Sequence, residues 1–286
     1  MADAEILLRV ARCSRLNAAS REHCWAMLDE SEKVRNRRFR FQADQDRHML
    51  GRALLRSAIA EQLAVEPQSL TLLLDAHGKP YLEKPTGTGS SAVNEVSFNL
   101  SHSGDWVVVA LAEAPVGIDV EHTARNNDVL ALADRYFFGR ELAELQSFPE
   151  AEQPERFFDY WTLKEAYMKA RGEGIALGLE NFGFRLRGDS SPSALNGVRD
   201  NPKRAVATIA HEPTSQIQLM LDDCLDDDPA AWQFLCATPE EDYRLALAIR
   251  SERTLKLRVE EYFSERHTQA LDWTLNAAWQ PSLNAQ

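Results

Sequence analysis

The sequence predicts an α+β fold made of two similar halves. Two segments, 44–63 and 153–171, read as long amphipathic helices, and each is followed by short apolar runs of strand length. Ala114-Pro115 interrupts the chain near its middle, and the order of helices followed by strands recurs after it. Helices ahead of strands in each half favour helices on one face of mainly antiparallel sheets. We therefore expect two α+β subdomains related by pseudo-two-fold symmetry.

The first half, residues 1–114, is expected to begin with a strand and to end with a pair of strands. The apolar run from Trp106 to Ala112 is too short to cross a bilayer and predicts a buried strand. The expected elements are, in order, a strand at 5–10, helices at 20–40 and 44–63, a strand at 70–74, a turn at 76–80, a loop at 84–91, and paired strands at 96–100 and 106–111.

The second half, residues 115–250, repeats this order. Residues 188–231 are rich in Gly, Ser, Pro and Asp, which predicts an irregular insertion. Residues 251–286 are expected to form a charged, helical C-terminal extension. The other expected elements are a strand at 116–121, helices at 128–147 and 153–171, and strands at 180–187, 232–237 and 243–249.

Composition describes an acidic chain of 286 residues with the apolar content of a globular protein. The formal net charge of −12 disfavours a nucleic-acid partner, because nucleic-acid binders need excess Lys and Arg. The four cysteines show no C-x-x-C spacing, so reduced thiols and a cytoplasmic location are expected. The first residues show no basic segment followed by an apolar one, which argues against a secretory signal.

Asp119 and Glu121 lie two positions apart in a segment of strand character. This spacing points both carboxylates to one face of the strand and the apolar Ile118 and Val120 to the other. Carboxylate oxygens are hard ligands that suit Mg²⁺ or Mn²⁺. The alternative is a solvated strand end, which is the usual location of charged residues.

Lys164 and Glu165 lie inside an otherwise apolar and aromatic helix. Trp161, Glu165 and Met168 share one face, so Glu165 lies on a partly apolar surface where an unpaired carboxylate is costly. Lys169 follows Glu165 by four positions, and the alternative is therefore an ordinary i,i+4 ion pair.

Ser101-His102-Ser103 is expected in the turn between the paired strands. A turn that presents hydroxyls, an imidazole and backbone N–H groups suits the binding of phosphate oxygens. One alternative is local turn hydrogen bonding. Another is a Ser101–His102 dyad for acyl chemistry, although adjacent strand residues point apart and no G-x-S-x-G elbow is present.

Taken together and in order, these segments resemble the 4′-phosphopantetheinyl transferases, in the larger, pseudo-dimeric (Sfp-like) type that serves peptide and polyketide synthases. The resemblance covers about residues 30–185 and a strand at 243–249. The matching segments are G-[IV]-D-x-E at 117–121, W-[ST]-x-K-E-[AS]-x-x-K at 161–169, the Ser-His-Ser element at 99–103, G-K-P at 78–80, and Arg135-Tyr136-Phe137 with Glu141.

The resemblance implies that the 4′-phosphopantetheine arm of coenzyme A is moved to a serine hydroxyl of an apo acyl or peptidyl carrier protein, with release of 3′,5′-ADP. It implies Mg²⁺, or Mn²⁺ in its place, as cofactor and coenzyme A as co-substrate. The implied metal ligands are Asp119, Glu121 and Glu165. The implied catalytic residues are Glu165, Lys169 and Lys164, and the implied coenzyme A contacts are Arg35, Arg47, Lys79, Ser101, His102 and Lys169.

The chain also departs from the family pattern at the site for the 3′-phosphate of coenzyme A. Arg35 aligns with a basic position there, but a neighbouring basic position falls on Glu32, and Lys33 is the candidate replacement. A monomer without membrane partners is expected. The competing functions are a non-catalytic coenzyme A or nucleotide-binding regulator with the same fold, and a serine hydrolase built on Ser101 and His102.

Overall fold

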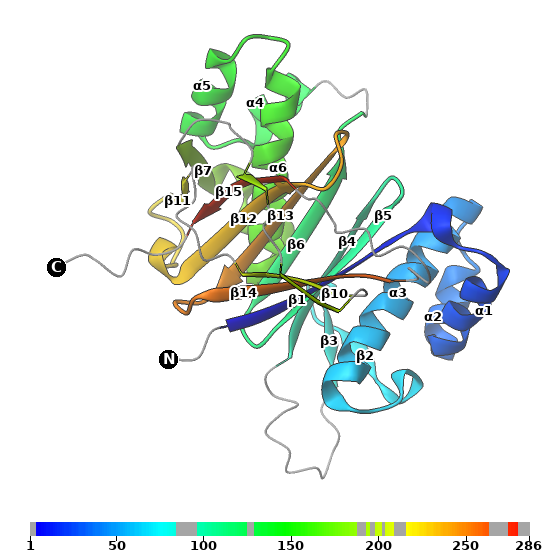
Figure 1. Ribbon diagram of the computed structural model, residues 1–286. Coiled ribbons are helices and arrows are strands. Elements are labelled where there is room, and N and C mark those ends of the chain that lie inside the picture. The colour runs from blue at the N-terminus through cyan, green and yellow to red at the C-terminus, as the bar shows by residue number, and fades with distance from the viewer. Residues whose placement is uncertain are drawn as a thin grey trace.

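Two large β-sheets pack face to face, and helices cover their outer faces (Figure 1). The arrangement is seen in a computed structural model that describes residues 4–83, 96–124, 129–187, 193–194, 198–201, 204–208, 216–262 and 274–279. The α+β class predicted from the sequence is confirmed. Within the described residues, no helix is both long and apolar enough to cross a membrane.

The first sheet combines strands from distant parts of the chain in the order β4-β5-β1-β14-β10-β9. Strand β1 lies antiparallel to β5 and parallel to β14. Helix α3 packs on β5, β1 and β4. The strands are β1 (Ala4–Arg12), β4 (Ser97–Ser103), β5 (Trp106–Ala112), β9 (Val198–Asn201), β10 (Arg204–Thr208) and β14 (Leu255–Glu261), and the helices of this half are α1 (Ala18–Met27), α2 (Glu30–Asn36) and α3 (Gln42–Leu63).

The second sheet has the order β6-β13-β12-β15-β8. Helix α6 packs across β6 and β13. The strands are β6 (Val116–His122), β8 (Ser193–Ala194), β12 (Trp232–Thr238), β13 (Tyr243–Arg250) and β15 (Thr274–Trp279), and the helices are α4 (Val129–Tyr136), α5 (Gly139–Ser147) and α6 (Gln153–Arg171). Two small antiparallel pairs complete the described strands: β2 (Leu72–Leu74) with β3 (Pro80–Leu82), and β7 (Phe182–Arg187) with β11 (Gln216–Leu221).

The two halves repeat one topology. In each half a first strand precedes three helices, and two later strands then pair with each other. The sheet order β4-β5-β1 of the first half corresponds to β12-β13-β6 of the second, strand for strand. The internal duplication that the sequence indicated is therefore present in the fold.

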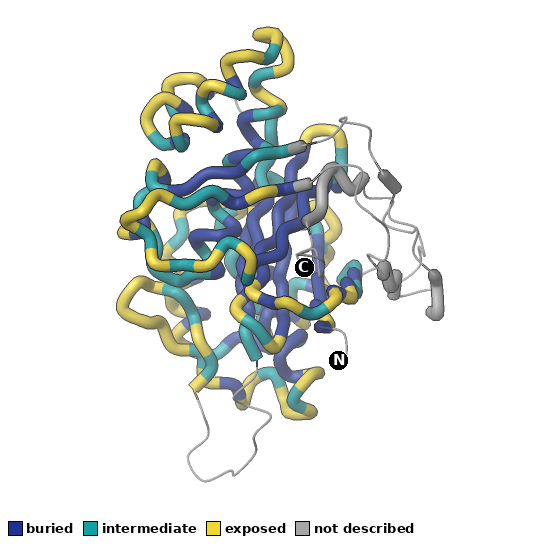
Figure 2. Tube along the Cα trace, turned by 90° about the vertical axis from the view of Figure 1, so that its left-hand side faces the viewer, coloured by how far each residue is buried: buried dark blue, intermediate teal, exposed yellow. Residues whose placement is uncertain are grey.

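The core has three layers because strand residues alternate between the faces of their sheets. On β5, Val108 packs between the two sheets, whereas Val107 and Val109 pack against the helices of the first half. This double burial explains the unbroken apolar run of β5. The third layer joins α6 to the outer face of the second sheet. Figure 2 shows buried residues along the central strands and exposed ones on the outer helices.

Two segments that the sequence predicted as single helices are each divided. The 20–40 segment breaks at Leu28, and α2 then begins with a capping box in which the Asp29 carboxylate accepts from Glu32 N and the Glu32 carboxylate accepts from Asp29 N. The 128–147 segment breaks at Phe137 and Phe138 between α4 and α5.

The prediction of a helical C-terminal extension at 251–286 is wrong. Residues 255–261 form β14, whose Leu255, Leu257 and Val259 enter the core between the sheets. Residues 274–279 form β15 beside β12. The period-two pattern of Leu255, Leu257 and Val259 was a strand signal that the high charge of the segment obscured.

The prediction that 188–231 is irregular is also wrong in part. Its described residues include β8, β9, β10 and β11, and β10 extends the first sheet beside β14. Its described residues 222–231 are irregular except for a short 3₁₀ helix at Pro229–Ala231, which agrees with the prediction. Residues 188–192, 195–197, 202–203 and 209–215, and the predicted loop at 84–91, lie outside the described residues.

Candidate active site

The edges of the two sheets meet where β4 runs beside β6. Every second side chain of β4 accepts a hydrogen bond from a backbone N–H of β6. These N–H groups at the sheet edge are therefore satisfied by side chains, although the described strands β4 and β6 form no backbone hydrogen bonds with each other. The four contacts are Ser97 Oγ with Val116 N at 3.2 Å, Asn99 Oδ1 with Ile118 N at 2.9 Å, Ser101 Oγ with Val120 N at 3.4 Å, and Ser103 Oγ with His122 N at 3.0 Å. We call these contacts the β4–β6 ladder.

Gly117 allows α6 to lie directly against β6. A Cβ atom at this position would lie 2.0 Å from the carbonyl oxygen of Ala166 and 2.5 Å from the Ala170 nitrogen, so any side chain here would displace the helix. This close approach brings the Glu165 and Lys169 side chains of α6 near the carboxylates of β6.

Asp119 is a buried carboxylate held by two partners. Its Oδ1 accepts hydrogen bonds from Ser101 Oγ at 2.8 Å and from Lys169 Nζ at 2.5 Å. Its Oδ2 is buried and has no hydrogen-bond partner among the described residues. Burying a carboxylate oxygen without a partner costs free energy, unless a cation or a hydrogen-bond donor binds it.

Glu121 and Glu165 complete a group of three carboxylates. Glu121 accepts a hydrogen bond from Ser103 Oγ at 2.8 Å, and it shares the face of β6 that carries Asp119. Burial raises the pKa of Glu165 to about 7, and the negative charges of Asp119 and Glu121 add to this against the opposing effect of Lys169. The three carboxylates are thus close enough to repel one another.

Lys169 is the cation of this group. Burial acts to lower the pKa of its ammonium, but Asp119 and Glu165 outweigh this and raise the pKa above its ordinary value. Its Nζ also donates to Ser101 Oγ at 3.2 Å. Three carboxylates against one ammonium leave a net negative charge.

No group of three or more His, Cys, Asp or Glu side chains within the described residues is gathered tightly enough to hold a metal ion as it stands. The predicted ligands Asp119, Glu121 and Glu165 lie in one neighbourhood, and the ammonium of Lys169 lies among them. The orphaned Oδ2 of Asp119 and the net negative charge fit a hard divalent cation.

The expectation that Ser101-His102-Ser103 forms a turn is wrong, because all three residues belong to β4 and the turn is Gly104-Asp105. Ser101 and Ser103 point toward β6, whereas His102 lines a hollow bounded by α3. Ser101 Oγ is already engaged by Asp119, Lys169 and Val120, so a Ser–His dyad for acyl chemistry is not formed.

A basic hollow of about 350 Å³ lies beside this group. Partial burial, together with the nearby cations Arg47 and Lys169, lowers the pKa of His102, which places the hollow and the carboxylate group side by side. Its charged and imidazole-bearing lining residues are Glu32, Arg35, Asp44, Arg47, His48, Arg52 and His102. Three arginines outnumber two carboxylates here, so the hollow suits an anion.

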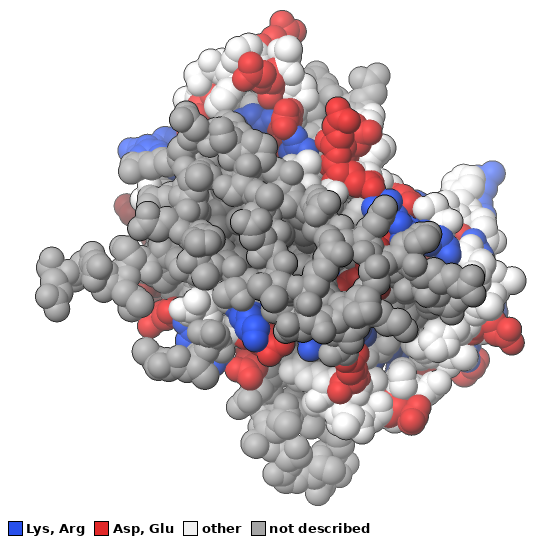
Figure 3. Space-filling view, in the orientation of Figure 1, with Lys and Arg blue, Asp and Glu red and all other residues white. Residues whose placement is uncertain are grey.

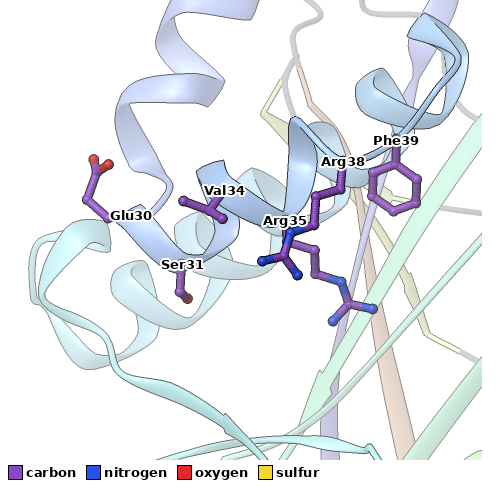
Figure 4. A pocket seen from close by; sticks show the side chains of 6 residues that line it. All are labelled: Glu30, Ser31, Val34, Arg35, Arg38 and Phe39. Atoms are coloured by element: carbon purple, nitrogen blue, oxygen red, sulfur yellow. The ribbon is translucent and has the colours of Figure 1, made fainter.

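Arg35 also lines a second, more open hollow on the outer side of α2 (Figure 4). In this view the side chains of Arg35, on α2, and Arg38, in the turn after α2, extend to the same side, and Glu30 lies apart from them. By contrast, Figure 3 shows acidic side chains gathered at the α4–α5 end of the other half. The first half therefore presents local positive charge within a chain that is acidic as a whole.

Arg47 and Lys79, both predicted to bind coenzyme A, have internal partners. Arg47 pairs with Asp44 and donates to the carbonyl oxygen of Gly104 at 3.2 Å. Lys79 Nζ donates to the carbonyl oxygens of Lys169 at 2.7 Å and Ala170 at 3.2 Å, at the end of α6. Lys79 thus connects the β2–β3 hairpin to the second half.

The expectation that Lys164 takes part in the chemistry is wrong. Its side chain is fully buried, and its ammonium binds Glu141 at 2.6 Å and the carbonyl oxygen of Phe182. The rings of Phe137 and Phe182 lie over it. Adjacent positions on a helix point in different directions, so Lys164 enters the core while Glu165 faces the site.

Sequence reasoning also missed residues that shape the site. Asn99 and Gly117 position β6, and His48 and Arg52 line the basic hollow. Polar residues alternate at Ser97, Asn99, Ser101 and Ser103, and this alternation is a strand signal. The strand that these side chains contact, β6, follows β5 and a further turn, so the contact between β4 and β6 is not evident from residue spacing. Arg52 follows His48 by four positions, a helical spacing that could have indicated a shared face.

Comparison with known proteins identifies the two halves separately. The model of the 4′-phosphopantetheinyl transferase superfamily matches residues 115–248, and the model described as 4′-phosphopantetheinyl transferase, N-terminal, matches residues 17–114. The two matched segments meet in the connection between β5 and β6.

Individual proteins are similar over more than half of this chain. The 4′-phosphopantetheinyl transferase psf-1 of Bacillus pumilus is 40% identical over 152 residues, which are 53% of this chain and 61% of that protein. The 4′-phosphopantetheinyl transferase Sfp of Bacillus subtilis is 30% identical over 178 residues, 62% of this chain and 75% of that protein. A phosphopantetheinyl transferase of a Thraustochytrium species is 36% identical over 197 residues, 64% of this chain and 66% of that protein.

Proposed function

The chain belongs to the 4′-phosphopantetheinyl transferase family, and we propose that it moves the 4′-phosphopantetheine arm of coenzyme A to a serine hydroxyl of an apo acyl or peptidyl carrier protein, releasing 3′,5′-ADP. The observation that carries this proposal is the meeting of Asp119, Glu121, Glu165 and Lys169 between β6 and α6. A basic hollow beside them supplies room and charge for an anionic co-substrate.

Asp119, Glu121 and Glu165 would hold Mg²⁺, or Mn²⁺ in its place. The buried, unpartnered Oδ2 of Asp119 and the mutual repulsion of the three carboxylates support this assignment. When bound, the cation supplies Lewis-acid stabilisation of the diphosphate oxygens. In the described geometry Lys169 already neutralises Oδ1 of Asp119, so Oδ2 is the oxygen left for a metal ion.

Glu165 would orient the carrier serine and accept its proton, directly or through one water. The serine oxygen forms a bond to the phosphorus that carries the pantetheine arm, and the bond from that phosphorus to the bridging oxygen breaks. The leaving group is 3′,5′-ADP, and the serine proton passes to the Glu165 carboxylate. A half-buried carboxylate with a pKa raised to about 7 is a stronger base than an exposed one.

Lys169 would neutralise charge on the transferring phosphoryl group, since its ammonium already lies between Ser101 and Asp119. Ser101 and His102 would contact diphosphate oxygens from the two faces of β4. Phosphoryl transfer depends mainly on positioning and charge neutralisation, which these residues provide from rigid strands.

Arg35 and Arg47 would bind the adenosine-phosphate end of coenzyme A in the basic hollow. Lys79 would add one donor, because two of its three N–H groups are used at the end of α6. Both sides of the site come from one chain, so a monomer suffices. We place the protein in the cytoplasm, with carrier proteins as its macromolecular partners and no nucleic-acid partner.

The proposal is tested by incubating the protein with coenzyme A, Mg²⁺ and several apo carrier proteins, and by measuring the intact mass of each carrier. We expect a mass increase equal to the phosphopantetheine group, abolished by EDTA and restored by added Mg²⁺. Glu165→Gln should lower kcat by about 10²- to 10⁴-fold while coenzyme A still binds. Unmodified carriers throughout, with intact coenzyme A binding, would instead indicate a non-catalytic binder.

A further inference from the structure

Coenzyme A carries anionic groups at two places, the diphosphate and the phosphate on the ribose 3′-oxygen. The carboxylate group with Lys169 and Ser101 accounts for the first place under the proposed function. The second needs cations at a distance from these carboxylates, and the basic hollow on the α3 side of β4 supplies them.

Arg52 is a half-satisfied cation in the wall of this hollow. Its Nε pairs with one carboxylate oxygen of Glu32, and its two terminal nitrogens have no hydrogen-bond partner among the described residues. The side chain is 14% exposed, so it is held in place but is not sealed from the hollow. Its planar guanidinium therefore keeps a pair of parallel donors for an oxyanion.

Glu32 fixes the position of Arg52. Its second oxygen pairs with the fully buried Arg56 at 2.7 Å and accepts from Asp29 N at 3.1 Å in the capping box of α2. Glu32 is therefore compensated even without Arg52. Its carboxylate faces the arginines of α3, which limits its repulsion of an anion in the hollow.

His48 adds a neutral donor beside Arg52. Burial, together with Arg52 and Arg35, lowers the pKa of His48 to about 4, so the ring is neutral at pH 7. Asn36 Nδ2 donates to the Gln45 carbonyl oxygen at 2.7 Å, which fixes the orientation of that amide, and it lies 3.2 Å from His48 Nδ1. Nδ1 is then the acceptor, and the proton of the neutral ring is on Nε2.

Lys33, the replacement cation suggested by the sequence, is directed elsewhere. Its ammonium pairs with Glu30 at 2.9 Å, and the residue does not line the hollow. We propose that Arg52, positioned by Glu32, acts with Arg35 as the cation pair that binds the 3′-phosphate of coenzyme A. The acidic residue at position 32 is thus offset by an arginine one helix away, and the proposal rests on the transferase function proposed above.

The test compares coenzyme A with dephospho-coenzyme A, which lacks the 3′-phosphate, in carrier modification by the parent and by Arg52→Met. We expect Arg52→Met to raise the KM for coenzyme A by about ten- to a hundredfold, the scale of a charge-assisted hydrogen bond. The KM for dephospho-coenzyme A and both kcat values should stay within about twofold of the parent's, because the carboxylate group is untouched. Arg52→Lys should recover part of the preference for coenzyme A.

Two further variants separate binding from folding. Lys33→Met is the matched control and should behave as the parent does. Arg35→Met removes an exposed side chain and should show the same selective loss, so the subsite stays testable even if Arg52→Met is unstable. A selective loss in Lys33→Met but not in Arg52→Met or Arg35→Met would overturn the assignment, as would equal losses for both co-substrates.

Failure of the proposed function gives a different result. If the parent modifies no carrier, calorimetry can still compare 3′,5′-ADP with ADP, which lacks the 3′-phosphate. Tighter binding of 3′,5′-ADP, lost in Arg52→Met, would support the subsite without transfer activity. Equal binding of the two nucleotides by the parent would reject the subsite.

Discussion

The two halves of the molecule share a structural device that holds their helices together. In each half the long helix buries one cation completely: Arg56 of α3 and Lys164 of α6. Each cation pairs with a glutamate in the first turn of the preceding short helix, Glu32 of α2 or Glu141 of α5. Each glutamate also accepts a hydrogen bond from the backbone N–H three residues before it.

The halves differ on the surfaces that face the site. The first half presents hydroxyl and amide groups on β4 and cations on α3, whereas the second presents carboxylates on β6 and the Glu165–Lys169 pair on α6. A duplicated scaffold thus carries two kinds of chemistry. We infer that the first half mainly binds the anionic co-substrate and the second mainly performs the transfer.

The largest expected effect tests the shared device. Lys164→Met should lower the free energy of unfolding by about 3–5 kcal/mol, because it leaves the buried Glu141 carboxylate without its cation. Arg56→Met should cost less, because Glu32 keeps its ion pair with Arg52. The measurement is denaturant unfolding of both variants beside the parent. The double variant Lys164→Met/Glu141→Gln should recover much of the loss, since no buried charge remains.

The same variants also test the separation of structure from chemistry. At a temperature where Lys164→Met is folded, its kcat should match that of the parent. A stable Lys164→Met protein that has lost turnover would contradict the structural role and would indicate that Lys164 takes part in the reaction.

Asp119→Asn tests the assignment of transfer to the second half. It keeps the size of the side chain but removes the charge on Oδ1 and Oδ2, so kcat should fall by about a hundred- to a thousandfold. Binding of coenzyme A, measured by calorimetry without metal, should change less, because the basic hollow is intact. Near-normal turnover at ordinary Mg²⁺ would remove the metal assignment.

Much of the fold could be predicted because its signals are local. The unbroken apolar run of β5 marks a strand buried on both faces, and the repeat of helices before strands marks the duplication. The divided helix at 20–40 was also readable, since Asp29 and Glu32 form a capping box. The strand β14 was missed because its charged residues alternate with the apolar ones and its partner, β1, lies at the other end of the chain.

The site was predictable where its chemistry follows from spacing. Asp119 and Glu121 share a face, as a D-x-E pair in a strand must. The role of Lys164 could not be read in this way, because Glu141 lies 23 residues earlier and the two meet only through packing of α5 on α6. The β4–β6 ladder could not be predicted from the periodicity of the sequence either, because side chains of one strand bond to the backbone of another.

Asn99→Ala tests whether the β4–β6 ladder joins the halves. Asn99 is buried, and its loss leaves the Ile118 N–H without its acceptor, so the free energy of unfolding should fall by about 1–3 kcal/mol. Ser97→Ala, at the half-buried end of the ladder, is the matched control and should cost less. Equal, negligible effects of both changes would show that the sheets are held by apolar packing alone.

The smallest expected effect concerns Lys79, which crosses from the first half to the end of α6. The last carbonyl groups of a helix lack partners within the helix, and a cation there contributes about 0.3–1 kcal/mol. Lys79→Met should lower the free energy of unfolding by that amount, because two carbonyl oxygens lose their donor. The KM for coenzyme A should rise less than in Arg52→Met, since only one N–H of Lys79 is left for a phosphate. If Lys79→Met leaves the stability unchanged and raises the KM for coenzyme A as much as Arg52→Met does, the Lys79 ammonium binds coenzyme A instead of the helix end. The two halves would then be joined at this point through the co-substrate.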